Sequence, residues 1–134
     1  IMPHTNYLPK DKHDMAAIQR LAKLSAHELS LLIPELLTWL QDGNWPVATP
    51  IAQLLLEDPQ ILLTHLTPVL LGDDEVWTYH VLNQLVAKMP LEIMNETTPL
   101  LERLASTYHS EDEEGVRELA LHLLKKLESS KPLK

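Results

Sequence analysis

Aliphatic residues recur every three or four positions through most of this chain, a spacing that places them on one face of a helix. Phe is absent and aromatic residues make up 4% of the 134 residues, so a core has to be built mainly from Leu, Ile, Val and Ala. Leu and Ala favour helix, whereas the β-branched residues that favour strands are scarce. The sequence therefore predicts an all-α protein.

Three stretches of the chain share one pattern, an amphipathic helix, a turn and a second amphipathic helix. They cover residues 33–55, 59–89 and 99–127, and their second helices are expected to begin near residues 45, 74 and 112. Such pairs cannot bury their apolar stripes alone and must stack. We expect a short HEAT-like alpha-solenoid of about three antiparallel helix pairs, forming a single domain over residues 1–134.

The first 12 residues lack periodicity and are expected to form an extended lead-in. One or two helices should precede the pairs, the first after Asp11 and the second after Ser25. Ser25 and Glu28 have the spacing of a capping box, in which each side chain accepts a hydrogen bond from a free backbone N–H of the first turn. Residues 129–134 are expected to fray.

Glycine and proline mark the expected helix ends. Gly43 and Gly72 fall just past the first helix of a pair, where a left-handed C-terminal cap favours Gly. Pro34 is expected to end one helix and open the next. Pro50 and Pro68 lie inside helical patterns and are expected to kink them.

The net charge of −8 is unevenly distributed. Residues 26–100 contain ten carboxylates and a single basic residue, Lys88. Binding to phosphates requires clustered Lys and Arg, so this composition argues against nucleic acid and against an anionic membrane surface as partners.

The chain contains no Cys, which excludes disulfides and thiolate metal sites and fits a reducing compartment. It has neither the apolar run of about 18 residues that a membrane span requires nor a recognisable signal peptide. We expect a cytoplasmic protein.

Several short segments of the chain form a distinctive set. They are Leu8–Asp14, Leu32–Leu37, Trp39–Asp42, Asn44–Ala48, Asp73, Asp74, Trp77 and Tyr79. Together these segments resemble a bacterial family of small proteins that is described as a domain of unknown function and has a HEAT-like fold. The resemblance covers roughly residues 7–90. It implies the helical-repeat fold and brings no activity, cofactor or catalytic residue.

Acidic residues occupy all three expected turns inside the helix pairs. Because stacked pairs place their turns along one edge, these carboxylates are expected to form an acidic ridge, which could bind a basic partner protein. The alternative is that each acid caps a helix N-terminus or interacts with its dipole. The acids concerned are Asp42, Asp73, Asp74, Glu75, Glu111, Asp112, Glu113 and Glu114.

Trp45 and Trp77 each open the second helix of a pair, and stacking would bring them near each other. If exposed, they would be aromatic anchors of an interface. If buried, which we favour, they would be wedges between repeats with each indole N–H bonded to a carbonyl. Trp39 is expected in the core or at its border.

The polar segment from Pro9 to Asp14 also admits two interpretations. In the favoured one Asp11 caps a helix, and Lys12 or His13 binds back to the body of the protein. In the other, Lys12, His13 and Asp14 project toward Asp42 and Asn44 and add to a binding site.

No catalytic residue, metal site or cofactor site is identified. The seven histidines are scattered, and none has a partner at metal-ligand spacing. His65 and His80 could meet between the helices of one pair. A glycine-rich phosphate loop and a GxSxG nucleophile motif are both absent from the sequence.

The sequence favours a non-enzymatic interaction module that binds a basic protein through its acidic edge or a groove. One variant is an immunity-type protein that covers a toxin's basic active site. The alternatives are a small-molecule or peptide binder that uses Trp45, Trp77 and Tyr79, and, less favoured, a HEAT-like nucleic-acid enzyme.

Overall fold

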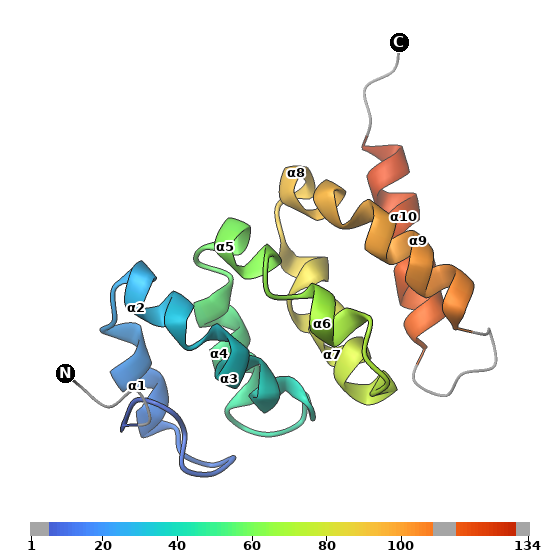
Figure 1. Ribbon diagram of the computed structural model, residues 1–134. Helices are drawn as coiled ribbons and strands as arrows, with labels where there is room; N and C mark the ends of the chain where they lie inside the picture. Colours follow the sequence, from blue (N-terminus) through green and yellow to red (C-terminus); the bar gives the residue numbers. More distant parts are fainter. Residues whose placement is uncertain (1–5, 109–114, 131–134) are drawn as a thin grey trace.

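The computed structural model describes residues 6–108 and 115–130, and every regular element within those ranges is helical. The prediction of an all-α protein is therefore confirmed (Figure 1). Residues 1–5, 109–114 and 131–134 lie outside the described residues. The first part of the expected lead-in and most of the expected tail fall there, but Ser129 is the last residue of a helix.

The helices alternate between two layers (Figure 1). One layer holds the second helices of the pairs, each a continuous helix, preceded by α1. These elements are α1 (Ala16–Ala22), α4 (Ala48–Leu55), α7 (Glu75–Gln84) with the short 3₁₀ helix η3 (Val86–Lys88), and α10 (Val116–Ser129). The other layer holds the first helices, which are all interrupted. They are α2 (Ala26–Leu31), α3 (Ile33–Leu37) and η2 (Thr38–Leu40); α5 (Pro59–Leu63) and α6 (Thr67–Leu70); and α8 (Leu91–Met94), η4 (Asn95–Thr97) and α9 (Thr98–Thr107).

A proline lies in the first turn of α3, α6 and α9, the later segment of each interrupted helix. Pro34, Pro68 and Pro99 lack the backbone N–H that would bond to the preceding turn, so each helix restarts at its proline. The predicted break at Pro34 and kink at Pro68 are confirmed. The third pair does not open at Pro99, as expected from the sequence, because α8 and η4 precede it.

Pro50 does not kink its helix. It is the third residue of α4, which runs without a break from Ala48 to Leu55. The first N–H groups of a helix have no intrahelical partner, so a proline in the first turn costs no hydrogen bond.

Successive pairs are joined within each layer. α1 packs on α4 and α7 packs on α10, while the Gln84 Nε2 donates to Thr49 Oγ1 at 3.0 Å and so links α7 to α4. In the other layer α6 packs on α9, and Gln60 Nε2 lies 3.4 Å from Glu96 Oε1. Between the layers lies an aliphatic core without Phe. Its fully buried large members are Leu21, Leu36, Leu37, Leu40, Ile51, Leu55, Leu62, Leu66, Leu70, Leu82, Leu85 and Met94.

The local capping predictions are correct for the capping box and for Asp74, and wrong for Asp11. Ser25 and Glu28 form the complete capping box of α2, and Asp74 accepts the Trp77 N–H at 3.0 Å at the start of α7. Asp11 does not cap α1; its side chain accepts the His13 N–H at 2.8 Å within a turn. The expected start of the second helix near residue 45 is also wrong, because α4 begins at residue 48.

The expected left-handed conformation at Gly43 and Gly72 is wrong, because among the described residues only Gly115 has a positive φ, of 75°. Gly43 is needed for a different reason. A Cβ at this position would lie 2.8 Å from Cε1 of the His80 ring, with Nδ1 closer still. The turn after the first helix therefore packs directly against α7 of the next pair.

This close approach predicts that Gly43→Ala lowers the free energy of unfolding by about 1–3 kcal/mol, as overpacking does. In a His80→Ala background the added methyl group has room, so the same substitution should cost markedly less. Urea unfolding of the wild type, Gly43→Ala, His80→Ala and the double variant measures how much the cost of Gly43→Ala depends on His80. A His65→Ala background is the control, and an equal cost in all three backgrounds would contradict a clash with His80.

Candidate functional site

The turns between the first and second helices lie along one edge of the molecule, together with the segment that precedes α1 (Figure 1). We call this the turn edge; it comprises residues 10–14, 41–47 and 71–75. The Val47 N–H donates to the carbonyl oxygen of Lys12 at 3.3 Å, and the His80 ring lies on Gly43. Segments far apart in sequence thus contact one another at this edge.

At the start of the turn edge, Asp14 holds the lead-in against α1. Its Oδ2 accepts the Lys10 N–H at 3.0 Å and Nη2 of Arg20 at 3.2 Å. The same guanidinium donates to the carbonyl oxygens of Asn6 and Leu8. The hydrogen bond from Lys10, followed by the interactions with Arg20, holds the pKa of Asp14 below its ordinary value of 3.8. Asp14 therefore organises this segment and turns toward Arg20.

The next turn is built by Asp42. Its carboxylate accepts the Asn44 N–H at 2.9 Å, and its carbonyl oxygen accepts the Trp45 N–H at 3.1 Å. These two bonds explain why α4 starts later than the sequence predicts. Asn44 is exposed beside the half-buried Asp42, and Lys12 and His13 are exposed on the adjacent lead-in.

The aromatic residues in and beside the turn edge are half-buried and packed on the core. Trp77 donates its indole N–H to the carbonyl oxygen of Leu37 at 2.8 Å, which confirms the predicted wedge between pairs. Trp45 packs edge-on against Trp39, with ring centroids 5.8 Å apart. Tyr79 packs edge-on against His80.

The three rings proposed as a ligand cage are thus each engaged with a different neighbour. Among the described residues no ring contact joins Trp45, Trp77 and Tyr79 to one another. The expected proximity of Trp45 and Trp77 is not seen as a ring contact, because Trp45 turns toward the end of its own first helix.

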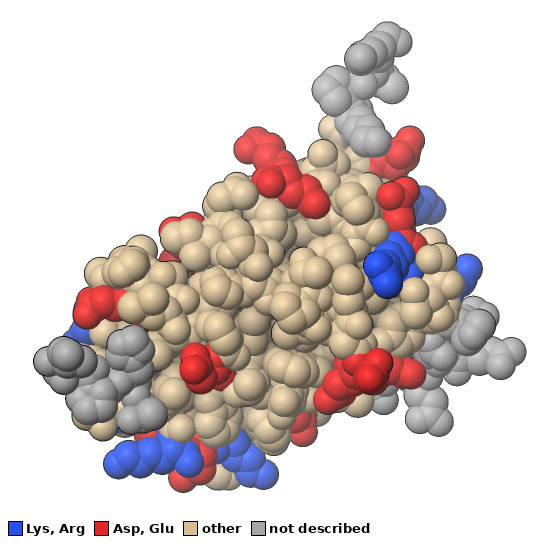
Figure 2. All heavy atoms as spheres, in the orientation of Figure 1, with Lys and Arg blue, Asp and Glu red and all other residues tan. Residues whose placement is uncertain are grey.

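The most acidic part of the turn edge is the turn between α6 and α7 (Figure 2). Asp73, Asp74 and Glu75 are all exposed, and Asp74 is also the cap of α7. Neither Asp73 nor Glu75 forms an ion pair with another described residue. Capping of α7 uses one acid, Asp74, so the carboxylates of Asp73 and Glu75 remain available for a ligand.

A hollow of about 340 Å³ opens beside these carboxylates, between the end of α6 and α9. Asp73 and Glu75 line one side, and Arg103, Thr107 and Tyr108 of the next pair line the other. The apolar part of its wall comes from Leu70, Leu71 and Leu104. Arg103 and Tyr108 could not be predicted as part of this hollow, since nothing in their spacing along the sequence indicates that α9 faces this turn.

The charge of the turn edge changes along its length. Lys10 and Lys12 are exposed at the end near α1, whereas the acids gather at α6 and α7 (Figure 2). The predicted ridge is therefore acidic in its middle part and mixed in charge at its start. Its predicted third cluster, Glu111, Asp112, Glu113 and Glu114, lies outside the described residues.

The histidines form no common site in the described part of the chain. His80 contacts Gly43 and Tyr79, and no described contact joins it to His65. Within residues 6–108 and 115–130 no group of three His, Cys, Asp or Glu residues is arranged to hold a metal ion. No helix there is both long and apolar enough to cross a membrane.

The fold and its turn edge define a protein of short, two-layered helix pairs. The chain matches the model of the family described as Domain of unknown function (DUF5071) over residues 7–124, and it belongs to that family. No curated protein matches the chain at a significant level.

The Asp14 cluster generates a pH prediction. Because its folded-state pKa is lowered, ionised Asp14 contributes stability above its unfolded pKa, and this contribution is lost as the pH falls through the folded value. Asp14→Asn should therefore lower the free energy of unfolding at pH 7, and the deficit should shrink as the pH is lowered below about 3.8.

Urea unfolding at a series of pH values measures this deficit. Asp11→Asn serves as the control, since the Asp11 carboxylate accepts the His13 N–H within a turn and forms no ion pair with another described residue, so its deficit should vary less with pH. A deficit for Asp14→Asn that is the same at pH 7 and pH 3 would show that the charge of Asp14 does not stabilise the lead-in.

Proposed function

We propose that this protein is a HEAT-like, non-enzymatic interaction module that binds a basic partner protein at the acidic part of its turn edge. The observation that carries the proposal is the pair of exposed carboxylates, Asp73 and Glu75, beside a hollow that Arg103 and Tyr108 also line. A rigid scaffold of stacked helices holds these groups in place. Asp42 extends the acidic surface toward the preceding pair.

The chemistry of this surface suits a protruding Lys or Arg side chain. Exposed carboxylates attract a cation from a distance and reject acidic partners. The hollow adds apolar contacts from Leu71 and Leu104, against which the methylene stem of a long basic side chain can pack. Arg103 restricts how the partner's basic side chain lies in the hollow, because that side chain is repelled by Arg103 and can enter only on the side of Asp73 and Glu75.

The segments that resemble the family support the same location. Lys12, His13, Asp42, Asn44, Asp73 and Asp74 all belong to the turn edge, although they come from three separate parts of the chain. An interaction surface assembled from turns is typical of proteins in which a scaffold positions variable side chains. An immunity-type role, in which the acids cover the basic active site of a toxin, is one form this function can take.

The structure favours this proposal over the aromatic cage. The indole N–H of Trp77 is already bonded to Leu37, and the rings of Trp45 and Tyr79 pack on other neighbours. A ligand for these three rings would have to displace existing contacts, whereas Asp73 and Glu75 require no such rearrangement.

The double variant Asp73→Asn, Glu75→Gln tests the proposal. It removes two charges while keeping side-chain size, and it leaves the Asp74 cap in place. We expect its affinity for a fluorescein-labelled peptide rich in Lys, Arg and Leu to fall about five- to thirtyfold in fluorescence anisotropy, since two exposed charge pairs are lost.

The matched control is Glu57→Gln, Glu92→Gln, which removes the same charge from exposed positions outside the turn edge. Equal losses in the two variants would show a dependence on net charge alone. The same proteins can be immobilised and exposed to a bacterial lysate. The wild type and the control variant should retain larger amounts of basic proteins than the Asp73→Asn, Glu75→Gln variant. Failure of the wild type to retain any basic protein would refute the proposal.

A further inference from the structure

The layer formed by α1 and the second helices of the pairs differs in charge from the rest of this acidic protein. α1, α4 and η3 contain no Asp or Glu, and α7 has only Glu75, at its first residue. The acids of residues 6–108 lie before α1, in the first helices, at the start of α7 and in the connecting segments, which include Glu57 and Asp58 directly after α4. We call the exposed surface of α1, α4, α7, η3 and α10 the second-helix face.

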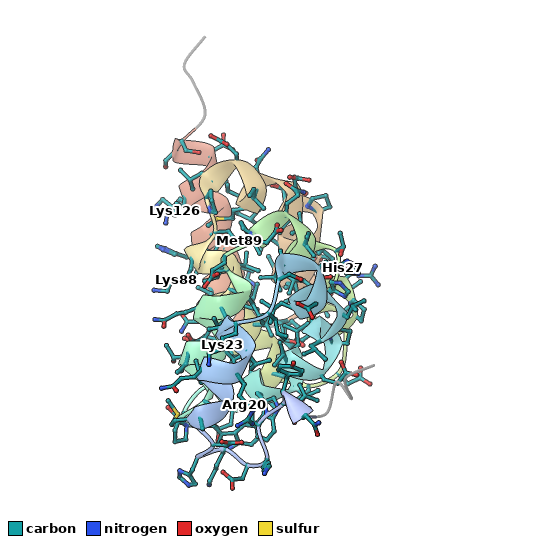
Figure 3. The ribbon with its side chains drawn as sticks, turned by 90° about the vertical axis from the view of Figure 1, so that its left-hand side faces the viewer. Arg20, Lys23, His27, Lys88, Met89 and Lys126 are labelled. Atoms are coloured by element: carbon teal, nitrogen blue, oxygen red, sulfur yellow. The ribbon has the colours of Figure 1, made fainter. Side chains whose placement is uncertain are left out.

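Lysines occur along this face in the order of its helices. Lys23 follows α1, Lys88 ends η3 and Lys126 lies in the last turn of α10. In Figure 3 these three side chains follow one another along the side of the second helices, while His27 of α2 lies on the opposite side. All three are exposed, and none forms an ion pair with another described residue.

Between Lys23 and Lys88, α4 itself is uncharged but polar, and the exposed Glu57 follows its last turn. The exposed residues of α4 include Thr49 and Gln53, and α7 exposes Asn83. These side chains can donate and accept hydrogen bonds with a peptide backbone. The face therefore combines a few well-separated cations with neutral hydrogen-bonding groups.

Helix dipoles explain only part of this distribution. A cation near a helix C-terminus is favourable, which accounts for Lys88 and Lys126 individually. The dipole does not disfavour an acid at an exposed position in the middle of a helix, yet α1 and α4 have none over their full lengths. In a chain with 19 acidic residues, their absence from α1 and α4 leaves a part of this face where an acidic ligand meets no carboxylate of the helices themselves, whereas the acids of the face lie at the start of α7 and on α10.

We propose that the second-helix face binds an extended acidic polypeptide segment of a partner. Packed helices lie about 8–10 Å apart, so the three spacings from α1 to α10 cover roughly 24–30 Å. An extended peptide rises about 3.3 Å per residue, and about seven to nine residues therefore cross the face. Carboxylates near the two ends of such a segment meet Lys23 at one end and Lys88 and Lys126 at the other.

The charge spacing distinguishes this ligand from a nucleic acid. A phosphate backbone requires closely spaced cations along its whole path. Here α4 supplies none, and Glu118 and Glu128 flank Lys126 on α10. A peptide with separated carboxylates matches the pattern, since its uncharged middle can bond to Gln53 and Asn83.

The test measures fluorescence anisotropy of a labelled twelve-residue peptide with Glu at every third position and Gly or Ser between. The wild type should bind it, and an otherwise identical peptide with Gln in place of Glu should not bind. Lys88→Glu with Lys126→Glu should weaken binding about tenfold, because two exposed attractions become repulsions. Lys126→Glu alone provides a second readout should the double variant be unstable.

The matched control for a single reversal is Lys10→Glu, which changes the net charge equally and lies on the turn edge near α1. It should change the affinity less than twofold, against a severalfold loss for Lys88→Glu. Equal losses in these two variants, or no binding of the acidic peptide by the wild type, would overturn the proposal. Tighter binding of a twelve-nucleotide oligothymidine, weakened by the same reversals, would replace the peptide with a nucleic acid.

Discussion

The hydrogen bond from the Trp77 indole to the carbonyl oxygen of Leu37 joins the start of α7 to the end of α3, and so joins one helix pair to the next. Close by, the His80 ring lies directly on the backbone of Gly43. These two contacts set how closely the second pair approaches the first. The position of the α6–α7 turn beside the preceding turn follows from them, and with it the shape of the turn edge.

Local signals in the sequence predicted local structure well. The capping box at Ser25 and the cap at Asp74 depend only on residues three positions apart, so they could be recognised without knowledge of the fold. Helical periodicity predicted the all-α class for the same reason. The start of α4 was misplaced because the turn at Asp42 is also stabilised by contacts that the local sequence does not reveal. The Trp45 ring packs against Trp39, and the Val47 N–H donates to the carbonyl oxygen of Lys12.

Spatial relationships between pairs were harder to predict. The role of Gly43 depends on the position of His80, 37 residues later in the chain, and was mistaken for a left-handed cap. Arg103 joins the acidic hollow only because α6 and α9 pack together. The uneven distribution of charge is visible along the sequence. That most acids lie away from α1 and α4 on one side of the molecule depends on which helices share a layer, and the sequence does not show this.

The interrupted first helices have a consequence for how this molecule acquires its structure. Five of their segments, α2, α3, α5, α6 and α8, contain only four to six residues. This is far below the length at which an isolated helix is stable in water. Each segment therefore depends on burial against the continuous helices behind it. Because prolines divide these helices into short segments, the first helices form only when they pack on the second helices. An excised helix pair would therefore lose its first helix before its second. In the full chain, each additional pair stabilises the first helices of its neighbours.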